Sequence, residues 1–407
     1  MSDDMDEITE YTSMFKEAML ADGGTLNDER ISISPQPQAS MIIIDQSTGY
    51  VKAIIGGRGE KTASLTLNRA TQTTRQPGST FKILTAFAPA MEEQGDTLAT
   101  KYESTYFEYE DGTKVNNWNK PDSDDPISMR EAIIRSINTA AVDCITQITP
   151  EVGYEYAQKF GITTLVDNYD NGWRIVSDKI QPLALGGIAK GVTGIELCAA
   201  YAAIANQGVY IKPRFYTKVL DSKGNILLDG QTPEQRQVIS KETAFLMTSA
   251  MQDVIKDKNG TAHDYIDMGQ MPAAGKTGTT NDYRDIWFAG YTPYYTCCIW
   301  GGYDNNEVLP DDDEYVCHGY DMILWNNIMN RIHKGRKILE FEQPSSISRH
   351  DACQQTGLLA NTQCPSAYSE LFNETKLPAE CTEHTPPKKN NKRSKNDADK
   401  DNAATDG

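Results

Sequence analysis

The sequence predicts an α+β fold in which an antiparallel sheet is covered by helices and joined to a mostly helical subdomain. Three observations support this fold class. Strand patterns appear first, over residues 41–55; a mainly helical block follows over about 128–206; and strand patterns return over 273–300. Because strands and helices are grouped in runs and do not alternate as βαβ units, a doubly wound parallel sheet is disfavoured.

The first strand pattern predicts a hairpin. An apolar run at Met41–Ile44 is followed by turn residues at Asp45–Gly49 and by a second run at Tyr50–Ile55. Apolar runs separated by a short polar, glycine-containing segment are typical of two antiparallel strands.

Later segments continue the pattern of grouped elements. Within the helical block, Ile195–Ala205 is the clearest helix. Ser240 is a suitable N-cap for a helix over Lys241–Ile255. Beyond these we expect two strands and a last helix, at Asp285–Tyr291, Tyr295–Trp300 and Asp321–His333.

The 407 residues divide into four predicted parts. Residues 1–35 are expected to be a linker or a small leading segment, and residues 36–343 the main catalytic domain. Residues 344–385 form a cysteine-containing C-terminal extension. Residues 386–407 are polar and poor in apolar side chains, which predicts a disordered tail.

The first chemical motif is the S-x-x-K sequence Ser79–Lys82. A turn at Pro77-Gly78 precedes it, and apolar residues then recur with helical spacing. A serine in the first turn of a helix lies among free backbone N–H groups that favour developing negative charge. Lys82 is on the same side of this helix, so its amine can reach the Ser79 hydroxyl. The alternative is a helix cap followed by an exposed lysine.

A second S-x-x-K, Ser13–Lys16, lacks this context. No turn precedes it, and the surrounding segment is acidic and polar. We therefore expect Ser13 to be an ordinary surface residue.

The second motif, Ser136–Asn138, lies between two apolar stretches and is typical of a break between two helices. Ser136 is a candidate proton relay. Asn138 is a candidate to hold either a substrate amide or Lys82. The alternative is that both side chains only cap the next helix.

The third motif, Lys276–Gly278, lies in a predicted strand. The ammonium group of Lys276 and the hydroxyl of Thr277 suit a terminal carboxylate. Gly278 allows the backbone of a ligand to approach closely. If this is an edge strand, a peptide can add to it as one more strand. The alternative is a strand that ends in a glycine turn.

The order and the wide gaps of these motifs match the serine–lysine motif set of penicillin-binding proteins and class A β-lactamases. From about Ala39 to Asn330 the sequence resembles the transpeptidase domain of class A penicillin-binding proteins. The resemblance extends beyond the three motifs to longer segments, namely Leu67–Gln72, Arg75–Ser79, Leu183–Gly187, Gly191–Leu197 and Gly275–Asp285.

The resemblance implies the penicillin-binding/β-lactamase-like transpeptidase fold and a catalytic role for each motif. Ser79 is implied to be the acylating nucleophile, which D-Ala-D-Ala stem peptides or β-lactams modify covalently. Lys82 is implied to be its general base, and Ser136 and Asn138 to line the proton path and the substrate. A lysine can act as a base only when desolvation or a nearby cation depresses its pKa.

The third motif is implied to bind the substrate. Lys276 and Thr277 would hold its carboxylate, and Lys276 would be the second cation near Lys82. Gly278 and Thr279 would line the substrate, and the backbone N–H groups of Ser79 and Thr279 would form the oxyanion hole.

Composition excludes several other classes. A formal net charge of −18 argues against nucleic acid as a partner. The sequence has no G-x-S-x-G, so a Ser-His-Asp hydrolase is disfavoured. Apolar runs are too short to span a bilayer, and the acidic segment Met1–Glu7 is unlike a signal peptide.

The resemblance places such an enzyme outside the cytoplasm, on the cell-wall side of the bacterial plasma membrane. Its partners would be peptidoglycan stem peptides and β-lactams, with cell-wall assembly proteins as candidates. Class A proteins carry an N-terminal membrane anchor and a glycosyltransferase domain. Because this chain has neither, we expect it to be a fragment that begins in the linker.

The extension contains three cysteines, Cys353, Cys364 and Cys381. Spacing leaves a Cys353–Cys364 disulfide open. Cys381 and His384 form a Cys-x-x-His pair, but the irregular spacing of the set argues against a zinc site. We expect neither a metal nor a cofactor.

The favoured function is a peptidoglycan D,D-transpeptidase. One alternative is a β-lactamase or D,D-carboxypeptidase, and another is a non-catalytic penicillin sensor or wall-assembly scaffold. A β-lactamase activates water with a glutamate, often in Glu-x-x-Leu-Asn, and no such string lies between Asn138 and Lys276. All three motifs are intact, which does not support a dormant site.

Overall fold

The structure is a computed structural model that describes residues 5–25, 36–61, 63–118, 125–310 and 318–384. It forms two compact units, Met1–Gln36 and Pro37–Gly407. In the first unit, helix α1 (Met5–Ala21) carries Ser13 at an exposed position, as expected for the second S-x-x-K. The expected disordered tail, residues 386–407, lies outside the described residues. No helix in the described ranges has the length and apolar character needed to cross a membrane.

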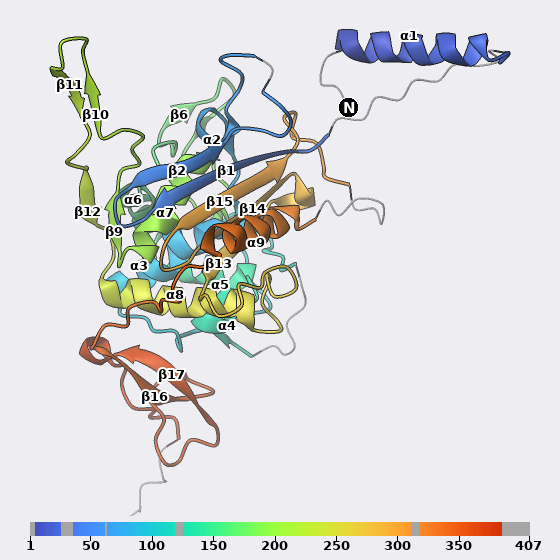
Figure 1. The fold of residues 1–407 in the computed structure, drawn as a ribbon. Helices are drawn as coiled ribbons and strands as arrows, with labels where there is room; N and C mark the ends of the chain where they lie inside the picture. The colour runs from blue at the N-terminus through green and yellow to red at the C-terminus, as the bar shows by residue number, and fades with distance from the viewer. Residues whose placement is uncertain (1–4, 26–35, 62, 119–124, 311–317, 385–407) are drawn as a thin grey trace, which may run out of the picture. The chain divides into compact units, whose positions relative to one another are not determined.

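A five-stranded antiparallel sheet forms the centre of the second unit (Figure 1). The expected hairpin is confirmed, and its first strand pairs with the strand over residues 296–302, so that Met41 lies opposite Ile299. The strand with the third motif is at the edge of the sheet. In spatial order the strands are β13 (Ala274–Thr279), β14 (Asp285–Tyr291), β15 (Thr296–Gly302), β1 (Gln38–Asp45) and β2 (Tyr50–Ile55).

Helices cover both faces of this sheet. Alternation along β14 directs Phe288 toward Trp325 and directs Tyr291 to the opposite face, where its hydroxyl bonds Thr248 at 2.8 Å. The helices that provide these contacts are α9 (Tyr320–His333) and α8 (Lys241–Lys256), both close to their expected bounds. Helix α7 (Gly194–Ala205) lies against β1 and β15, and its Cys198 is buried there. Ser240 caps α8, as predicted.

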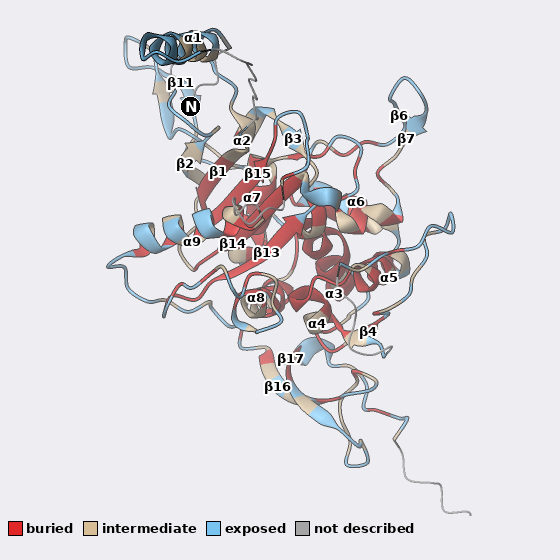
Figure 2. Cartoon of the chain, turned by 90° about the vertical axis from the view of Figure 1, so that its right-hand side faces the viewer, coloured by how far each residue is buried: buried red, intermediate tan, exposed pale blue. Residues whose placement is uncertain are grey.

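The remaining helices form the mostly helical part of the unit, and much of their surface is buried, as the red colour in Figure 2 shows. They are α2 (Arg69–Gln72), α3 (Ala88–Glu93), α4 (Met129–Ile134), α5 (Asn138–Ile148) and α6 (Pro150–Lys159), with the 3-10 turn η3 (Gln181–Leu185). Two further 3-10 turns lie elsewhere: η4 (Asn281–Tyr283) joins β13 to β14, and η5 (Glu374–Lys376) belongs to the C-terminal extension. Pairs of short strands lie outside the central sheet. They are β3 (Thr74–Arg75) with β8 (Val192–Thr193), β4 (Lys101–Tyr102) with β5 (Ile127–Ser128), β6 (Tyr169–Asp170) with β7 (Ile175–Val176), β9 (Val209–Ile211) with β12 (Gln235–Gln237), and β10 (Lys218–Leu220) with β11 (Ile226–Asp229).

The segment that carries Ser79 is less regular than the helix predicted from its apolar spacing. It begins as a 3-10 turn, η1 (Gly78–Thr80), and continues as a π-helix, η2 (Ile83–Phe87), before α3. Pro89 has no N–H to donate to the carbonyl of Thr85, which interrupts the α-helical ladder, and the N–H of Ala88 bonds Ile83 instead. The expected apolar face is nevertheless fully buried.

The C-terminal extension is a two-stranded ribbon, β16 (Ile347–Cys353) and β17 (Ala367–Asn373). It is attached to the catalytic domain by an ion pair between Glu370, which is 2% exposed, and Arg130 of α4. The two parallel N–H···O bonds of this pair are both 2.8 Å long. Since a buried carboxylate is costly unless it is paired, this contact favours the observed position of the ribbon.

Candidate active site

The three predicted motifs meet at one cleft of about 700 Å³. Ser79 comes from η1, the second motif from the junction of α4 and α5, and the third motif from the edge strand β13. The predicted residues that line the cleft are Ser79, Ser136, Asn138, Thr277 and Thr279. The two predicted lysines are fully buried behind this surface.

The hydroxyl of Ser136 lies between the two lysine ammonium groups. Lys276 Nζ donates to Ser136 Oγ at 2.8 Å, and Lys82 Nζ donates to the same atom at 3.2 Å. Lys82 also donates to the carbonyl of Ser136 and to Asn138 Oδ1, both at 2.6 Å. Of the two roles considered for Asn138, holding Lys82 is the one seen in this geometry.

Burial perturbs both amines. Removal from water lowers the pKa of Lys82 well below its usual value, and the nearby charge of Lys276 lowers it further. Burial lowers the pKa of Lys276 to about 7. The environment therefore favours a neutral amine at Lys82, which is the form that can accept a proton.

Lys82 and Ser79 are not in direct contact in this state. Within the described residues, the hydrogen bonds of the Lys82 amine end on Ser136 and Asn138. Catalytic hydrogen bonds are often incomplete without substrate. Ser136 Oγ is the group that contacts both amines and also faces the cleft with Ser79.

Two glycines allow the nucleophile turn to touch the edge strand. A Cβ on Gly278 would lie 2.4 Å from the carbonyl oxygen of Pro77, and one on Gly78 (φ +54°) would lie 2.9 Å from the backbone nitrogen of Thr279. A side chain at either position would force the two segments apart. This contact brings the backbone of Ser79 close to that of Thr279.

Ser136 has a backbone conformation that sequence patterns did not predict. Its φ of +54° lies in the left-handed region, which is uncommon for residues other than glycine. The conformation turns the chain between α4 and α5 and presents both the hydroxyl and the carbonyl to Lys82. Backbone strain of this kind is concentrated at functional sites.

Asn117 is a positioning residue that the sequence analysis missed. Its Oδ1 accepts the N–H groups of Asn138 and Thr139, at 2.8 and 3.1 Å, and so satisfies the first turn of α5. The neighbouring Asn116 accepts a bond from the Asn138 side chain through its carbonyl, at 2.7 Å. No local pattern connects these residues to a helix that begins about twenty positions later.

Three further residues of the cleft were also missed. Thr261 Oγ1 bonds Thr277 Oγ1 at 2.8 Å. Trp118 is 64% exposed on the cleft wall. Asp321, near the start of α9, is buried, and burial raises its pKa to about 7. Each is an ordinary residue in an ordinary local sequence, so only the assembled cleft identifies it.

Comparison with known proteins agrees with this geometry. The family model described as penicillin binding protein transpeptidase domain matches residues 39–297. Penicillin-binding protein 1A of Clostridium tetani is 32% identical over 377 residues, covering 90% of this chain and 47% of that protein. Penicillin-binding protein 1F of Bacillus subtilis is 32% identical and covers 76% of this chain and 42% of its own length. The chain thus spans about half the length of the curated relatives it matches.

Solved structures show the same fold. Penicillin-binding protein 1A from Haemophilus influenzae aligns with a TM-score of 0.69 at 24% identity, over 87% of this chain and 56% of that one. The PonA1 protein from Mycobacterium tuberculosis, solved in complex with penicillin V, aligns with a TM-score of 0.65 at 25% identity, over 77% of this chain and 82% of that one. These matches confirm the predicted fold class and the resemblance to class A penicillin-binding proteins.

Lys276 gives a testable pH dependence of stability. Because its pKa falls from 10.5 to about 7 on folding, the unfolded chain binds more protons between these values. The free energy of unfolding therefore rises with pH in this window, by up to about 1.4 kcal/mol per pH unit. Lys276→Met removes this contribution. In urea unfolding, the free energy of unfolding of the wild type relative to Lys276→Met should increase as the pH rises from about 7 toward 10.5.

Lys218→Met, at an exposed position, controls for the change in net charge. A difference between wild type and Lys276→Met that stays flat or shrinks with rising pH would contradict the burial of an ionisable Lys276.

Proposed function

The chain belongs to the penicillin binding protein transpeptidase family, and from this we propose that it is a peptidoglycan D,D-transpeptidase. It would act on stem peptides that end in D-Ala-D-Ala. The observation that carries the proposal is the hydroxyl of Ser136 shared by two buried lysines, on the same cleft as Ser79. A serine nucleophile needs a base, and here the base is a desolvated amine.

In the acylation step, Ser79 Oγ attacks the carbonyl carbon between the two D-alanines. Its proton passes to the neutral amine of Lys82, through the hydroxyl of Ser136. The oxyanion of the tetrahedral intermediate is stabilised by the N–H groups of Ser79 and Thr279, whose backbones the paired glycines bring together. Collapse breaks the peptide C–N bond, and the leaving D-alanine takes a proton back through Ser136.

Deacylation reverses these roles. An amine from a neighbouring stem peptide attacks the ester carbonyl of the acyl-enzyme and forms a new peptide bond. Its proton follows the path used in acylation, and the hydroxyl of Ser79 is restored. Among the described strands, none pairs with the side of β13 opposite β14, so this side offers backbone groups to which an extended stem peptide can pair.

The terminal carboxylate of the substrate is assigned to the third motif. Lys276 is fully buried and bonds Ser136, so it acts through its field, while the hydroxyls of Thr277 and Thr279 face the cleft. A carboxylate bound nearby favours the charged form of Lys276 and raises its pKa. Substrate binding would thus protonate Lys276 and further favour the neutral form of Lys82.

β-Lactams are proposed to acylate Ser79 in the same way, since they present a strained amide beside a carboxylate. Because the substrate is cell-wall peptide, the enzyme is assigned to the extracytoplasmic side of the membrane. Cell-wall assembly proteins are candidate partners of the longer protein.

The nucleophile assignment predicts where penicillin attaches. Fluorescent penicillin should label the wild-type chain covalently, and Ser79→Ala should abolish labelling because the ester can no longer form. Ser13→Ala, which removes the other S-x-x-K serine, should label like wild type. Labelling that persists in folded Ser79→Ala would refute the assignment.

The base assignment predicts a large effect of Lys82→Arg. Arginine keeps the positive charge but does not deprotonate near neutral pH, so the acylation rate should fall at least about a hundredfold, the scale of a lost general base. Stopped-flow acylation by a chromogenic β-lactam measures this rate. Lys52→Arg, on the exposed side of β2, is the matched control and should react like wild type. A near wild-type rate for Lys82→Arg would exclude the base role.

The fate of the acyl-enzyme separates a transpeptidase from a β-lactamase. Among the described residues that line the cleft, none is a glutamate that would activate water. The penicilloyl adduct should therefore persist far longer than the turnover of an efficient lactamase, since a median enzyme turns over about 10 times per second. Intact mass spectrometry after penicillin is removed tests this. Rapid return of unmodified protein with steady penicillin consumption would instead assign a β-lactamase.

A further inference from the structure

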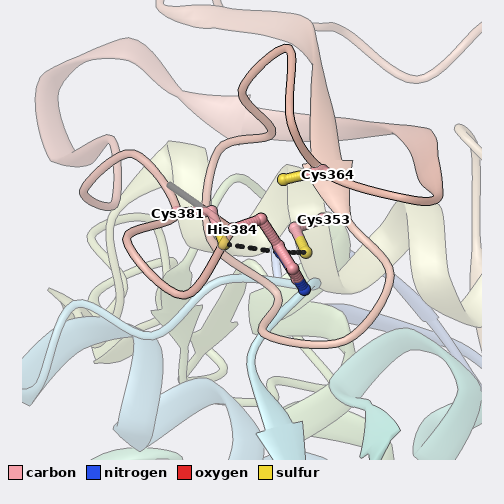
Figure 3. A group of neighbouring side chains, drawn as sticks. All are labelled: Cys353, Cys364, Cys381 and His384. Carbon is pink, nitrogen blue, oxygen red and sulfur yellow. Dashed lines mark hydrogen bonds between the residues drawn. The ribbon is translucent and has the colours of Figure 1, made fainter. Parts of the chain in front are cut away.

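The C-terminal extension brings three cysteines and one histidine together, far from the cleft in sequence. The ligand atoms of Cys353, Cys364, Cys381 and His384 all lie within 4.8 Å of one another (Figure 3). His384 Nδ1 is 3.3 Å from Cys381 Sγ and 3.6 Å from Cys353 Sγ. Cys353 and Cys381 are buried, and the other two are partly buried.

The sulfur–nitrogen separations are close to those of a tetrahedral metal site. With Zn–S distances of about 2.3 Å and Zn–N distances of about 2.0–2.1 Å, ligand atoms at the corners of a tetrahedron lie about 3.5–3.8 Å apart. The observed sulfur–nitrogen distances of 3.3 and 3.6 Å are close to this range. Three thiolates and one imidazole are a donor set that selects zinc among the common divalent ions.

The imidazole of His384 is oriented for ligation. Its Nε2 lies 2.8 Å from the amide oxygen of Gln355, an acceptor, so Nε2 carries the proton. Nδ1 is then left with a lone pair that points at two sulfur atoms. A hydrogen bond from the non-ligating nitrogen to an oxygen acceptor is the usual way in which proteins fix a metal-binding histidine.

Strand pairing explains how irregular sequence spacing produces a compact cluster. Leu359 pairs with the segment that carries Cys381: its N–H donates to the carbonyl of Ala379 and its carbonyl accepts the N–H of Cys381, at 3.1 and 2.8 Å. Asn361 contacts both Cys364 and Cys381. Its N–H donates to Cys364 Sγ at 3.4 Å, and its side chain donates to the carbonyl of Cys381 at 2.6 Å.

A disulfide accounts for less of this arrangement. All seven cysteines in the described part of the chain are free thiols. A Cys353–Cys364 disulfide, which the sequence spacing leaves open, would involve neither Cys381 nor the oriented His384. A pair of cysteines needs neither the third sulfur nor an imidazole that is held by Gln355.

We propose that Cys353, Cys364, Cys381 and His384 bind one Zn²⁺ as a structural site. On binding, the three thiols release three protons to solvent and the imidazole binds in its neutral form, so the site carries a net charge of −1. Four protein ligands leave no open coordination position for a substrate, which makes the site structural rather than catalytic.

The extension needs such a cross-link because its own core is small. Its fully buried apolar residues around the site are Ala352 and Phe372, which pack with Ala99 of the catalytic domain. A segment of this size cannot bury enough apolar surface to order its chain, and small domains of this kind commonly rely on a metal. Zinc would join the loop end of the ribbon, at Cys353 and Cys364, to the segment with Cys381 and His384, so that Glu370 keeps its position against Arg130.

Metal content of the whole chain tests the proposal. Protein purified without chelator should contain about one zinc per chain by elemental mass spectrometry. Cys381→Ser and His384→Ala should each lose it. His350→Ala, a histidine of the same ribbon that bonds Ser348 and Glu374 instead, should retain it. Cobalt in place of zinc should give thiolate charge-transfer and tetrahedral d–d bands that Cys364→Ser weakens.

A wild-type measurement removes the risk that a ligand variant does not fold. Chelation should increase hydrogen exchange in residues 347–384, and added zinc should reverse the increase. Gln355→Ala, which removes only the support of His384, should weaken zinc binding about 10- to 100-fold.

Three results would overturn the assignment. The first is folded, zinc-free protein with a disulfide between any two of the three cysteines. The second is zinc retained in both Cys381→Ser and His384→Ala. The third is exchange in the ribbon that does not respond to chelation. None of these readouts depends on β-lactam chemistry at Ser79, so failure here is distinct from failure of the proposed function.

Discussion

The site depends on two lysines that share one serine hydroxyl while both are fully removed from water. Two buried ammonium groups this close cannot both stay charged without a large desolvation and repulsion cost. The fold therefore favours a neutral form for at least one of them, and burial together with the charge of Lys276 lowers the pKa of Lys82. Two oxygen acceptors, the carbonyl of Ser136 and the side chain of Asn138, hold this amine in place. The general-base role proposed for Lys82 depends on this arrangement of charge.

The arrangement requires three segments that are far apart in the sequence to pack closely against one another. The edge strand approaches the nucleophile turn so closely that only glycine fits at positions 78 and 278. The loop between α4 and α5 places Ser136 at a positive φ, a conformation that costs on the order of 1–3 kcal/mol for a residue other than glycine. Asn117 opposes part of that cost, because it satisfies the N–H groups that the broken helix exposes. Strain at Ser136 is thus tied to the position of its hydroxyl.

Local patterns predicted those parts of the molecule that local physics determines. Alternating and helical apolar spacing located the hairpin at 41–55 and the helices α8 and α9, and the turn before Ser79 distinguished it from Ser13. Local patterns did not predict the features that depend on contacts between segments distant in the sequence. Asn117 acts on a helix from another segment, Asp321 reaches the cleft from α9, and the π-helical turn results from a single Pro89 within an otherwise helical pattern.

The extension illustrates the same limit more strongly. Ligand spacing in sequence argued against a metal because familiar zinc sites use short pairs of ligands within one turn. Here Leu359 and Asn361 assemble the cluster by pairing across segments, so the spacing carries little information. The family match ends at residue 297, and the ribbon lies beyond it. The small apolar core of the ribbon is the reason for proposing a metal as its source of order. Arg130 connects the two regions: it pairs with Glu370 of the ribbon and belongs to α4, the helix that ends just before Ser136. One short helix, α4, thus contacts the ribbon through Arg130 and leads directly into the motif that carries Ser136.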